Sequence, residues 1–383
     1  MDKRTVQDIF HRFYPAYLDQ YSPSPVQAKV AHNIMNCKTG AYGANVCVCE
    51  DCGFVQIHYN SCRNRCCPMC QAVPKEMWMD ARREDVLDAP YFHLVFTVPD
   101  ILNPVIYSNQ RLLYDALYHA ASSTISELTA DPKHLGAKVG YICILHTWGS
   151  EMNFHPHIHT ILLGGGLASN NQWKDNGENF FLPIRVISKM FRGKYLEELK
   201  RLWEEDKLVF HGTAEKFRNH YTFKELLDSC YGMDWIPHCK KTFNGAQTVI
   251  KYLGKYTHRI AVSNHRIVRM DDDTVTFLVK DYRNEGQWKE LTISGVEFVR
   301  RFLMHVPPRR FVRIRHYGLL CSRTKSQKLT LCRNLLGCKK YLSKLRDMEM
   351  PEILEHLYGI KVCVCKACGG HLGKPQMRMP LRC

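Results

Sequence analysis

The sequence of 383 residues has no run of about 18 apolar residues, the length that a membrane-spanning helix requires. Its first residues, MDKRTVQDIFHRF, lack the apolar core of a signal peptide. Internal repeats and low-complexity tracts are also missing. These absences argue against membrane, secreted and repeat proteins, so we expect a soluble, cytoplasmic protein. A length of 383 residues exceeds the usual limit for a single core and predicts two or three domains.

Acidic residues are scarce relative to basic ones, since 53 Lys and Arg face 37 Asp and Glu, a net charge of +16. Such a surface attracts polyanions, and nucleic acid is favoured over an acidic membrane. From Arg300 to Lys328 there are nine Lys or Arg and no acidic residue, interleaved with aromatic side chains. Basic groups can follow phosphates while aromatic rings stack on bases. We therefore predict DNA contacts here, with a solvated basic face as the alternative; the candidates are Arg309, Arg310, Arg313 and Arg315.

Cysteine is abundant and unevenly spread, with seven of the 18 cysteines between Cys47 and Cys70. Clustering in a chain without a signal peptide favours metal binding over disulfides. CEDC and CPMC each hold two cysteines two residues apart, so two tight turns could present Cys49, Cys52, Cys67 and Cys70 tetrahedrally to Zn²⁺. Further candidates are Cys47, His58, Cys62 and Cys66. CKACGG, with Cys365 and Cys368, is half of a second zinc site whose other half the spacing does not identify.

The stretch FHPHIHTILLGGG (154–166) alternates histidines ahead of an aliphatic run. In a strand, residues two apart share a face, so His157 and His159 can bind one cation. The preceding stretch GYICILHTWG (140–149) is also strand-like, and a short link predicts an antiparallel hairpin that places His146 opposite position 156 or 157. We predict a metal held by these three histidines. His155 is less favoured because it precedes Pro156, and hydrogen-bonded core histidines are the alternative.

A predicted helix at 247–262 contains Tyr252 and Tyr256, which lie four residues apart on one face. Tyrosines at this spacing are usually part of a core. Here Lys251, Lys255 and Arg259 surround them with positive charge that suits phosphate. A tyrosine hydroxyl can attack a phosphodiester, and a histidine-bound metal would polarise the phosphate.

Several segments together resemble the two-tyrosine HUH transposases of the insertion sequence 91 family, where HUH denotes histidine, hydrophobic residue, histidine. They are SCRNRCCPMCQ (61–71), HLVFTVP (93–99), LHTWGSEMNFHPHIH (145–159), YLGKYTHRIAVSN (252–264), FVRIRHYGLL (311–320) and CKACGG. The resemblance implies Mg²⁺ or Mn²⁺ on His157 and His159. Related relaxases support His146 as third ligand by analogy, with Gln247 as the runner-up. The family's cysteine segment commonly reads SCRNRHCP, whereas this chain has Cys66 at the position of the histidine. Both residue types bind zinc, so the resemblance does not identify which residues are the ligands.

The resemblance also implies an activity. Tyr252 and Tyr256 would cleave and rejoin single-stranded DNA at insertion-sequence ends and target DNA through a 5′-phosphotyrosine intermediate, in rolling-circle transposition. DNA binding would associate the protein with the nucleoid. The alternatives are a non-catalytic, zinc-dependent DNA-binding regulator and an HUH replication initiator or relaxase.

The expected fold is α+β, with a central antiparallel sheet flanked by helices. We expect an N-terminal zinc-binding domain (1–85), which either recognises element ends or is a structural clip. An HUH catalytic domain (86–297) and a basic C-terminal region with a candidate zinc knuckle (298–383) follow.

Overall fold

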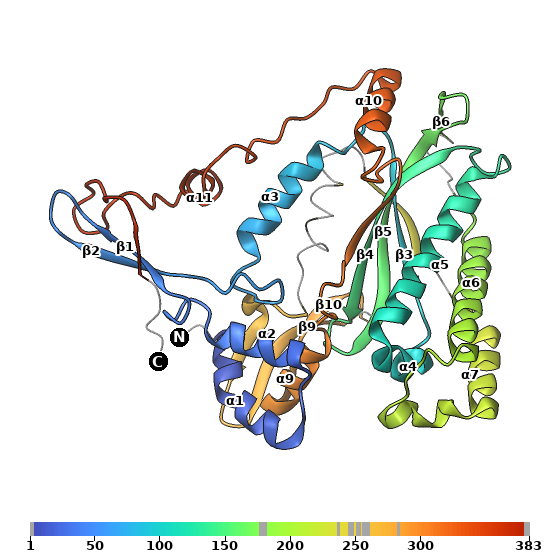
Figure 1. The fold of residues 1–383 in the computed structure, drawn as a ribbon, viewed down its shortest axis with the longest axis horizontal. Helices are drawn as coiled ribbons and strands as arrows, with labels where there is room; N and C mark the ends of the chain where they lie inside the picture. Colours follow the sequence, from blue (N-terminus) through green and yellow to red (C-terminus); the bar gives the residue numbers. More distant parts are fainter. Residues whose placement is uncertain are drawn as a thin grey trace.

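A computed structural model describes residues 4–175, 182–235, 238–243, 261–281 and 284–378, together with Val249 and Gly254. Within these residues the strands form three antiparallel sheets accompanied by helices (Figure 1). The predicted α+β class with a central antiparallel sheet is therefore confirmed. None of the described helices is long and apolar enough to cross a membrane.

The central sheet has the strand order β11-β4-β5-β3-β7, with β6 paired to β5. Its strands are β3 (Tyr91–Thr97), β4 (Lys138–Trp148), β5 (Phe154–Leu167), β6 (Trp173–Asp175), β7 (His238–Phe243) and β11 (Ile314–Gly318). β4 and β5 form the predicted hairpin, and their register pairs His146 with His157. Both strands are buried along almost their whole length, which explains their nearly continuous apolar sequences.

Helices α5 (Gln110–Ala130) and α6 (Ile184–Glu204) lie along one face of this sheet, and α3 (Ala72–Arg83) lies on the opposite side (Figure 1). Alternate residues of each strand point to opposite faces. On β4, Tyr141 and Cys143 belong to the core under α5 and α6, whereas Ile142 and Ile144 belong to the core under α3. The even-numbered His146 therefore lies on the α3 face.

A second core forms where the N-terminal helices pack on a small sheet. It joins α1 (Val6–Gln20) and α2 (Pro25–Met35) to β8 (Ile267–Met270), β9 (Thr274–Asp281), β10 (Gln287–Ser294) and α9 (Gly295–Met304). Phe10 of α1 meets Phe302 of α9 edge to face, with ring centroids 5.2 Å apart. Contacts thus cross the predicted boundaries at 85 and 297, and the division into three domains stays a prediction.

The C-terminal segment returns to the N-terminal part of the chain along α3 (Figure 1). It contains α10 (Lys325–Leu336), α11 (Met350–Tyr358) and β12 (Gln376–Arg378), and β12 pairs with the hairpin of β1 (Ala44–Val48) and β2 (Val55–Tyr59). Asp80 of α3 holds the segment midway, because its carboxylate accepts hydrogen bonds from the Tyr341 and Ser343 hydroxyls, each at 2.6 Å. Other helices in the described part of the chain are η1 (Asp100–Leu102), α4 (Asn103–Ser108), η2 (Gly212–Arg218), α7 (His220–Gly232) and η3 (Asn264–Arg266).

Candidate functional site

Three histidines meet on the α3 face of the central sheet. One ring nitrogen each of His146, His157 and His159 lies within 4.8 Å of the other two. The side chains are only 2–9% exposed. The structure thus brings together the three histidines that the strand spacing selected, while their role as metal ligands stays a prediction.

The hydrogen bonds of β5 direct two ring nitrogens toward each other. His157 Nδ1 lies 2.7 Å from the carbonyl oxygen of His155, to which it donates, so its Nε2 can act as a ligand. This Nε2 is 3.1 Å from Nε2 of His159. Two nitrogens bound at right angles to one ion, with bonds of about 2.1 Å, would be separated by about 3.0 Å. The donor set therefore fits a single cation.

His93 of β3 supports His159 from the neighbouring strand, a residue that the sequence analysis did not select. Its Nε2 lies 2.9 Å from His159 Nδ1, and the rings stack at 15°. With His159 Nε2 directed at a metal, Nδ1 carries the proton and donates a hydrogen bond to His93 Nε2. The available signal was a histidine within the otherwise apolar strand FHLVFTVP.

The turn of the β4–β5 hairpin is anchored in the second core. Met152 has a left-handed backbone with φ 58° and is fully buried. His305 Nε2 lies 3.0 Å from the Met152 carbonyl oxygen, and its Nδ1 lies 3.2 Å from the Thr147 hydroxyl. Burial lowers the pKa of His305 to about 4, so the ring is neutral near pH 7. Trp148 stacks on the ring of His146 with centroids 4.6 Å apart, which links this anchored turn to the cluster.

His155 and Gln247 were the alternatives to His146 as the third metal ligand. His155 lies outside the cluster, and its Nδ1 is 3.2 Å from a carboxylate oxygen of Asp100. Gln247 lies outside the described residues. Tyr252 and Tyr256 also lie outside them, as do Lys251, Lys255 and Arg259.

Two described residues of the predicted tyrosine segment lie on the α3 face. Val249 is buried in the core that contains Ile144 and Ile161. Gly254 is so close to α3 that the Met79 sulfur leaves no room for a Cβ at this position. Both residues are therefore placed on the side of the sheet that carries the three histidines.

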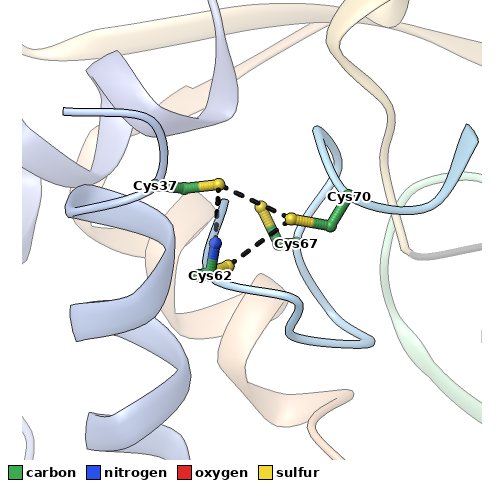
Figure 2. Close-up of side chains that lie close together, drawn as sticks. All are labelled: Cys37, Cys62, Cys67 and Cys70. Atoms are coloured by element: carbon green, nitrogen blue, oxygen red, sulfur yellow. Dashed lines mark hydrogen bonds between the residues drawn. The ribbon is translucent and has the colours of Figure 1, made fainter. Parts of the chain in front are cut away.

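A first group of four thiols lies between α2 and α3, and Figure 2 shows them pointing toward one another: Cys37, Cys62, Cys67 and Cys70. Cys70 Sγ is 3.5 Å from Cys37 Sγ and 3.6 Å from Cys62 Sγ. Four sulfurs bound tetrahedrally at about 2.3 Å from zinc are about 3.8 Å apart, whereas a disulfide measures about 2.05 Å. Hydrogen bonding with the Cys62 thiol lowers the pKa of Cys70 and raises the pKa of Cys67, so these neighbouring thiols share their protons.

The structure does not bring Cys49 and Cys52 together with Cys67 and Cys70, the combination that the sequence spacing suggested. Cys49 and Cys52 lie at the tip of the β1–β2 hairpin and are grouped with Cys365 and Cys368 instead. The five residues of β2 separate the two CxxC pairs by roughly 17 Å at about 3.3 Å per residue. Among the described residues, Cys66 joins neither group.

The fourth thiol of the first group belongs to Cys37, which the sequence analysis did not select. It follows the end of α2 and is 1% exposed. A cysteine ten residues ahead of the cluster was the only available signal. Cys62 and the Cys365–Cys368 pair, which were secondary candidates, do belong to the groups.

The basic candidates after α9 divide into two kinds. Arg309 and Arg310 are exposed beside a pocket of about 210 Å³ that Lys29 and Arg65 also line. Arg315 instead forms an ion pair with Asp115 and lies 4.0 Å from the Tyr118 ring centroid. Arg313 lies over Trp148, and burial lowers its pKa. Arg309 and Arg310 are thus the better placed for phosphate.

Comparisons with known proteins agree with these features. The family model described as "Transposase zinc-binding domain" matches residues 9–98, and the one described as "Putative transposase" matches residues 140–328. The first range contains the whole first thiol group, and the second contains the three histidines.

Two curated relatives align over most of the chain. "Putative transposase y4qJ" of Sinorhizobium fredii is 40% identical over 367 residues, covering 95% of this chain and 92% of the relative. The transposase for insertion sequence element IS801 of Pseudomonas savastanoi pv. phaseolicola is 30% identical over 333 residues, covering 85% of this chain and 78% of the relative.

Among solved structures, the metal-bound conjugative relaxase TrwC in complex with OriT DNA is 13% identical, covering 44% of this chain and 73% of that one with a TM-score of 0.25. A TM-score of this size does not establish a shared fold. The two relatives and the two family models are sufficient: the chain belongs to the insertion sequence 91 family of transposases.

Proposed function

We propose that this transposase cleaves and rejoins single-stranded DNA at insertion-sequence ends through a 5′-phosphotyrosine intermediate, and so drives rolling-circle transposition. The observation that carries the proposal is the buried convergence of His146, His157 and His159 in a chain of a transposase family. Its nucleophiles are Tyr252 and Tyr256, which lie outside the described residues.

The placement of the flanking residues supports this pairing of histidines with tyrosines. Val249 and Gly254 pack on the same face of the sheet as the three histidines. Two residues of the segment that contains the tyrosines therefore lie on the side of the sheet that carries the histidine nitrogens.

The proposed reaction exchanges one ester bond for another. A tyrosine oxygen forms a bond to the phosphorus, the bond from phosphorus to the 3′ oxygen breaks, and the proton lost by the hydroxyl is balanced by the proton that the 3′ oxygen takes up. A divalent cation on His146, His157 and His159 would polarise the phosphate and stabilise the charge on the leaving oxygen. The second tyrosine repeats the exchange at another DNA end, and the freed 3′ hydroxyl attacks a phosphotyrosine to rejoin the strands.

The chemistry of the ligands bears on the choice of ion. Three imidazoles are nitrogen donors, whereas Mg²⁺ prefers oxygen and retains several waters. Divalent transition-metal ions accept imidazole more readily. The site therefore suits Mn²⁺ better than Mg²⁺.

The test uses full-length protein and a labelled single-stranded oligonucleotide that carries an element end, with Mn²⁺. We expect a covalent protein–DNA adduct that the double change Tyr252→Phe with Tyr256→Phe abolishes. Tyr221→Phe is a matched control because Tyr221 is 76% exposed and lies on α7. His157→Ala with His159→Ala should abolish cleavage and leave DNA binding intact.

Two results would count against the mechanism. The absence of an adduct in the wild-type protein would favour a DNA-binding regulator without catalysis. An adduct that survives loss of both tyrosines would assign the nucleophile to another residue.

A further inference from the structure

We propose that Cys49, Cys52, Cys365 and Cys368 form a second Zn²⁺ site that fastens the C-terminal segment to the N-terminal β1–β2 hairpin. The four sulfurs lie within 4.8 Å of one another. Only half of this group lies in the region that matches the zinc-binding domain, residues 9–98. This site is thus additional to the group around Cys37.

The two halves of the site have the same local structure. Each is a C-x-x-C-G sequence, Cys49–Gly53 and Cys365–Gly369, and each glycine has a left-handed φ, 72° and 78°. In each half the glycine N–H donates to the carbonyl of the first cysteine, at 3.1 and 3.0 Å. The first cysteine N–H in turn donates to the carbonyl five residues later, at 2.9 and 2.8 Å. Two separate segments have therefore formed the same tight turn around a pair of thiols.

The sulfur positions match a tetrahedral zinc site. Cys49 Sγ is 3.5 Å from Cys368 Sγ, and Cys52 Sγ is 3.8 Å from Cys365 Sγ. These separations are close to the tetrahedral edge of about 3.8 Å and far above the disulfide length of about 2.05 Å. Backbone N–H groups of Ala367 and Gly370 point at Cys365 Sγ and Cys368 Sγ, each at 3.4 Å, which stabilises thiolates.

Backbone pairing continues the contact between the two segments. Cys49 forms a β-bridge with Leu372, and β1 pairs with β12 from Ala44 opposite Arg378 to Val46 opposite Gln376. The Glu50 N–H donates to the His371 carbonyl at 3.1 Å. Among the residues that the structure describes, the hydrophobic cluster at this junction consists of Cys47, Cys49, Cys365 and Leu372. So small a core cannot order the two segments by burial alone, which is the situation in which a bound metal supplies the folding energy.

The position of the site determines what the ion does. The contacts of Asp80 with Tyr341 and Ser343 fix the C-terminal segment to α3 without any help from the thiols. Loss of the second zinc would therefore free the part that follows these contacts, including α11 and β12, and leave the first thiol group and the central sheet in place.

The first experiment uses the wild-type protein, so it does not depend on a variant that folds. We expect about two zinc ions per chain by elemental analysis. Iodoacetamide labelling read by mass spectrometry should spare Cys49, Cys52, Cys365 and Cys368 and modify the exposed Cys321. A chelator should expose the four thiols together. One zinc per chain, iron in place of zinc, or independent labelling of the two pairs would each overturn the proposal.

The second experiment tests the pairing. Cys365→Ser with Cys368→Ser should lower the zinc content by one ion and make Cys49 and Cys52 reactive. It should also make the chain sensitive to protease beyond Ser343. Cys321→Ser with Cys363→Ser is the matched control, because both cysteines are exposed and outside the groups. If Cys49 and Cys52 stayed protected in the first variant, the second half of the site would lie elsewhere.

Discussion

Replacing His93 with phenylalanine tests how the histidine cluster is oriented. His93 and His159 are 7% and 8% exposed, and their ring nitrogens are 2.9 Å apart. Phenylalanine retains a ring of similar size and removes the acceptor. A metal on His159 Nε2 requires the proton on Nδ1, whereas the metal-free ring can move its proton to the other nitrogen. The lost bond therefore weakens the metal-bound state more than the metal-free one.

The expected size follows from the burial of this bond. A buried donor deprived of its partner costs about 1–3 kcal/mol, which corresponds to a loss of metal affinity of about 5- to 140-fold. Substitutions of residues that orient metal-bound histidines typically cost about 10- to 100-fold. We therefore expect His93→Phe to bind Mn²⁺ at least about tenfold more weakly.

The assay is a Mn²⁺ titration followed by the electron paramagnetic resonance of the free ion, with the Mn²⁺ midpoint of DNA cleavage as a second measurement. His93→Gln keeps a side-chain acceptor and should restore part of the affinity. His211→Ala, at an exposed histidine preceding η2, is the control. Wild-type Mn²⁺ affinity in a folded His93→Phe protein would refute the orienting role.

Three further predictions concern pH, zinc and the choice of ion. The pKa of His305 is about 4 in the folded protein, against an ordinary value of 6.5. Because the imidazole is protonated more readily in the unfolded chain, the free energy of unfolding falls as the pH drops from about 6.5 toward 4. The free energy of unfolding therefore loses about 2 kcal/mol through His305 at pH 5. Urea denaturation at pH 7 and pH 5 should show a smaller loss of stability for His305→Gln than for the wild-type protein, and an equal loss in both would contradict this. Cys37→Ser should lose the zinc of the first group to a chelator while Cys66→Ser retains it, as measured by zinc content, and equal retention would exclude Cys37 as a ligand. DNA cleavage should need less Mn²⁺ than Mg²⁺, and the reverse order in parallel titrations would argue against three nitrogen ligands.

Local regularities account for what could be predicted from the sequence. Side chains alternate between the two faces of a strand, which placed His157 and His159 on the same face. The short link between the two apolar runs allowed little choice of hairpin register, so the position of His146 opposite them could also be predicted. The same logic applied to the hairpin and to the strand at FHLVFTVP, both of which the structure contains.

Long-range pairing accounts for what could not be predicted. Nothing in the spacing of CEDC indicates that its partner is CKAC, because the two meet through strand pairing between distant segments. The position of Cys37 could not be predicted for a similar reason. It meets Cys70 because of how α2 packs, and no regular sequence spacing links the two cysteines. The contact of His93 with His159 depends on which strand lies next to β5, and this order is a property of the whole sheet.

The pairing of β1 with β12 has a consequence for the synthesis of the protein. Cys49 and Cys368 are 319 residues apart, which a ribosome adding about 5–20 residues per second covers in roughly 16–64 s. During that time β1 lacks its partner strand β12, and Cys49 and Cys52 lack the other two thiols of the proposed zinc site. Oxidation of these thiols, or their capture by another protein, would compete with formation of the proposed site in this interval, so we expect the nascent chain to be more vulnerable than the finished one.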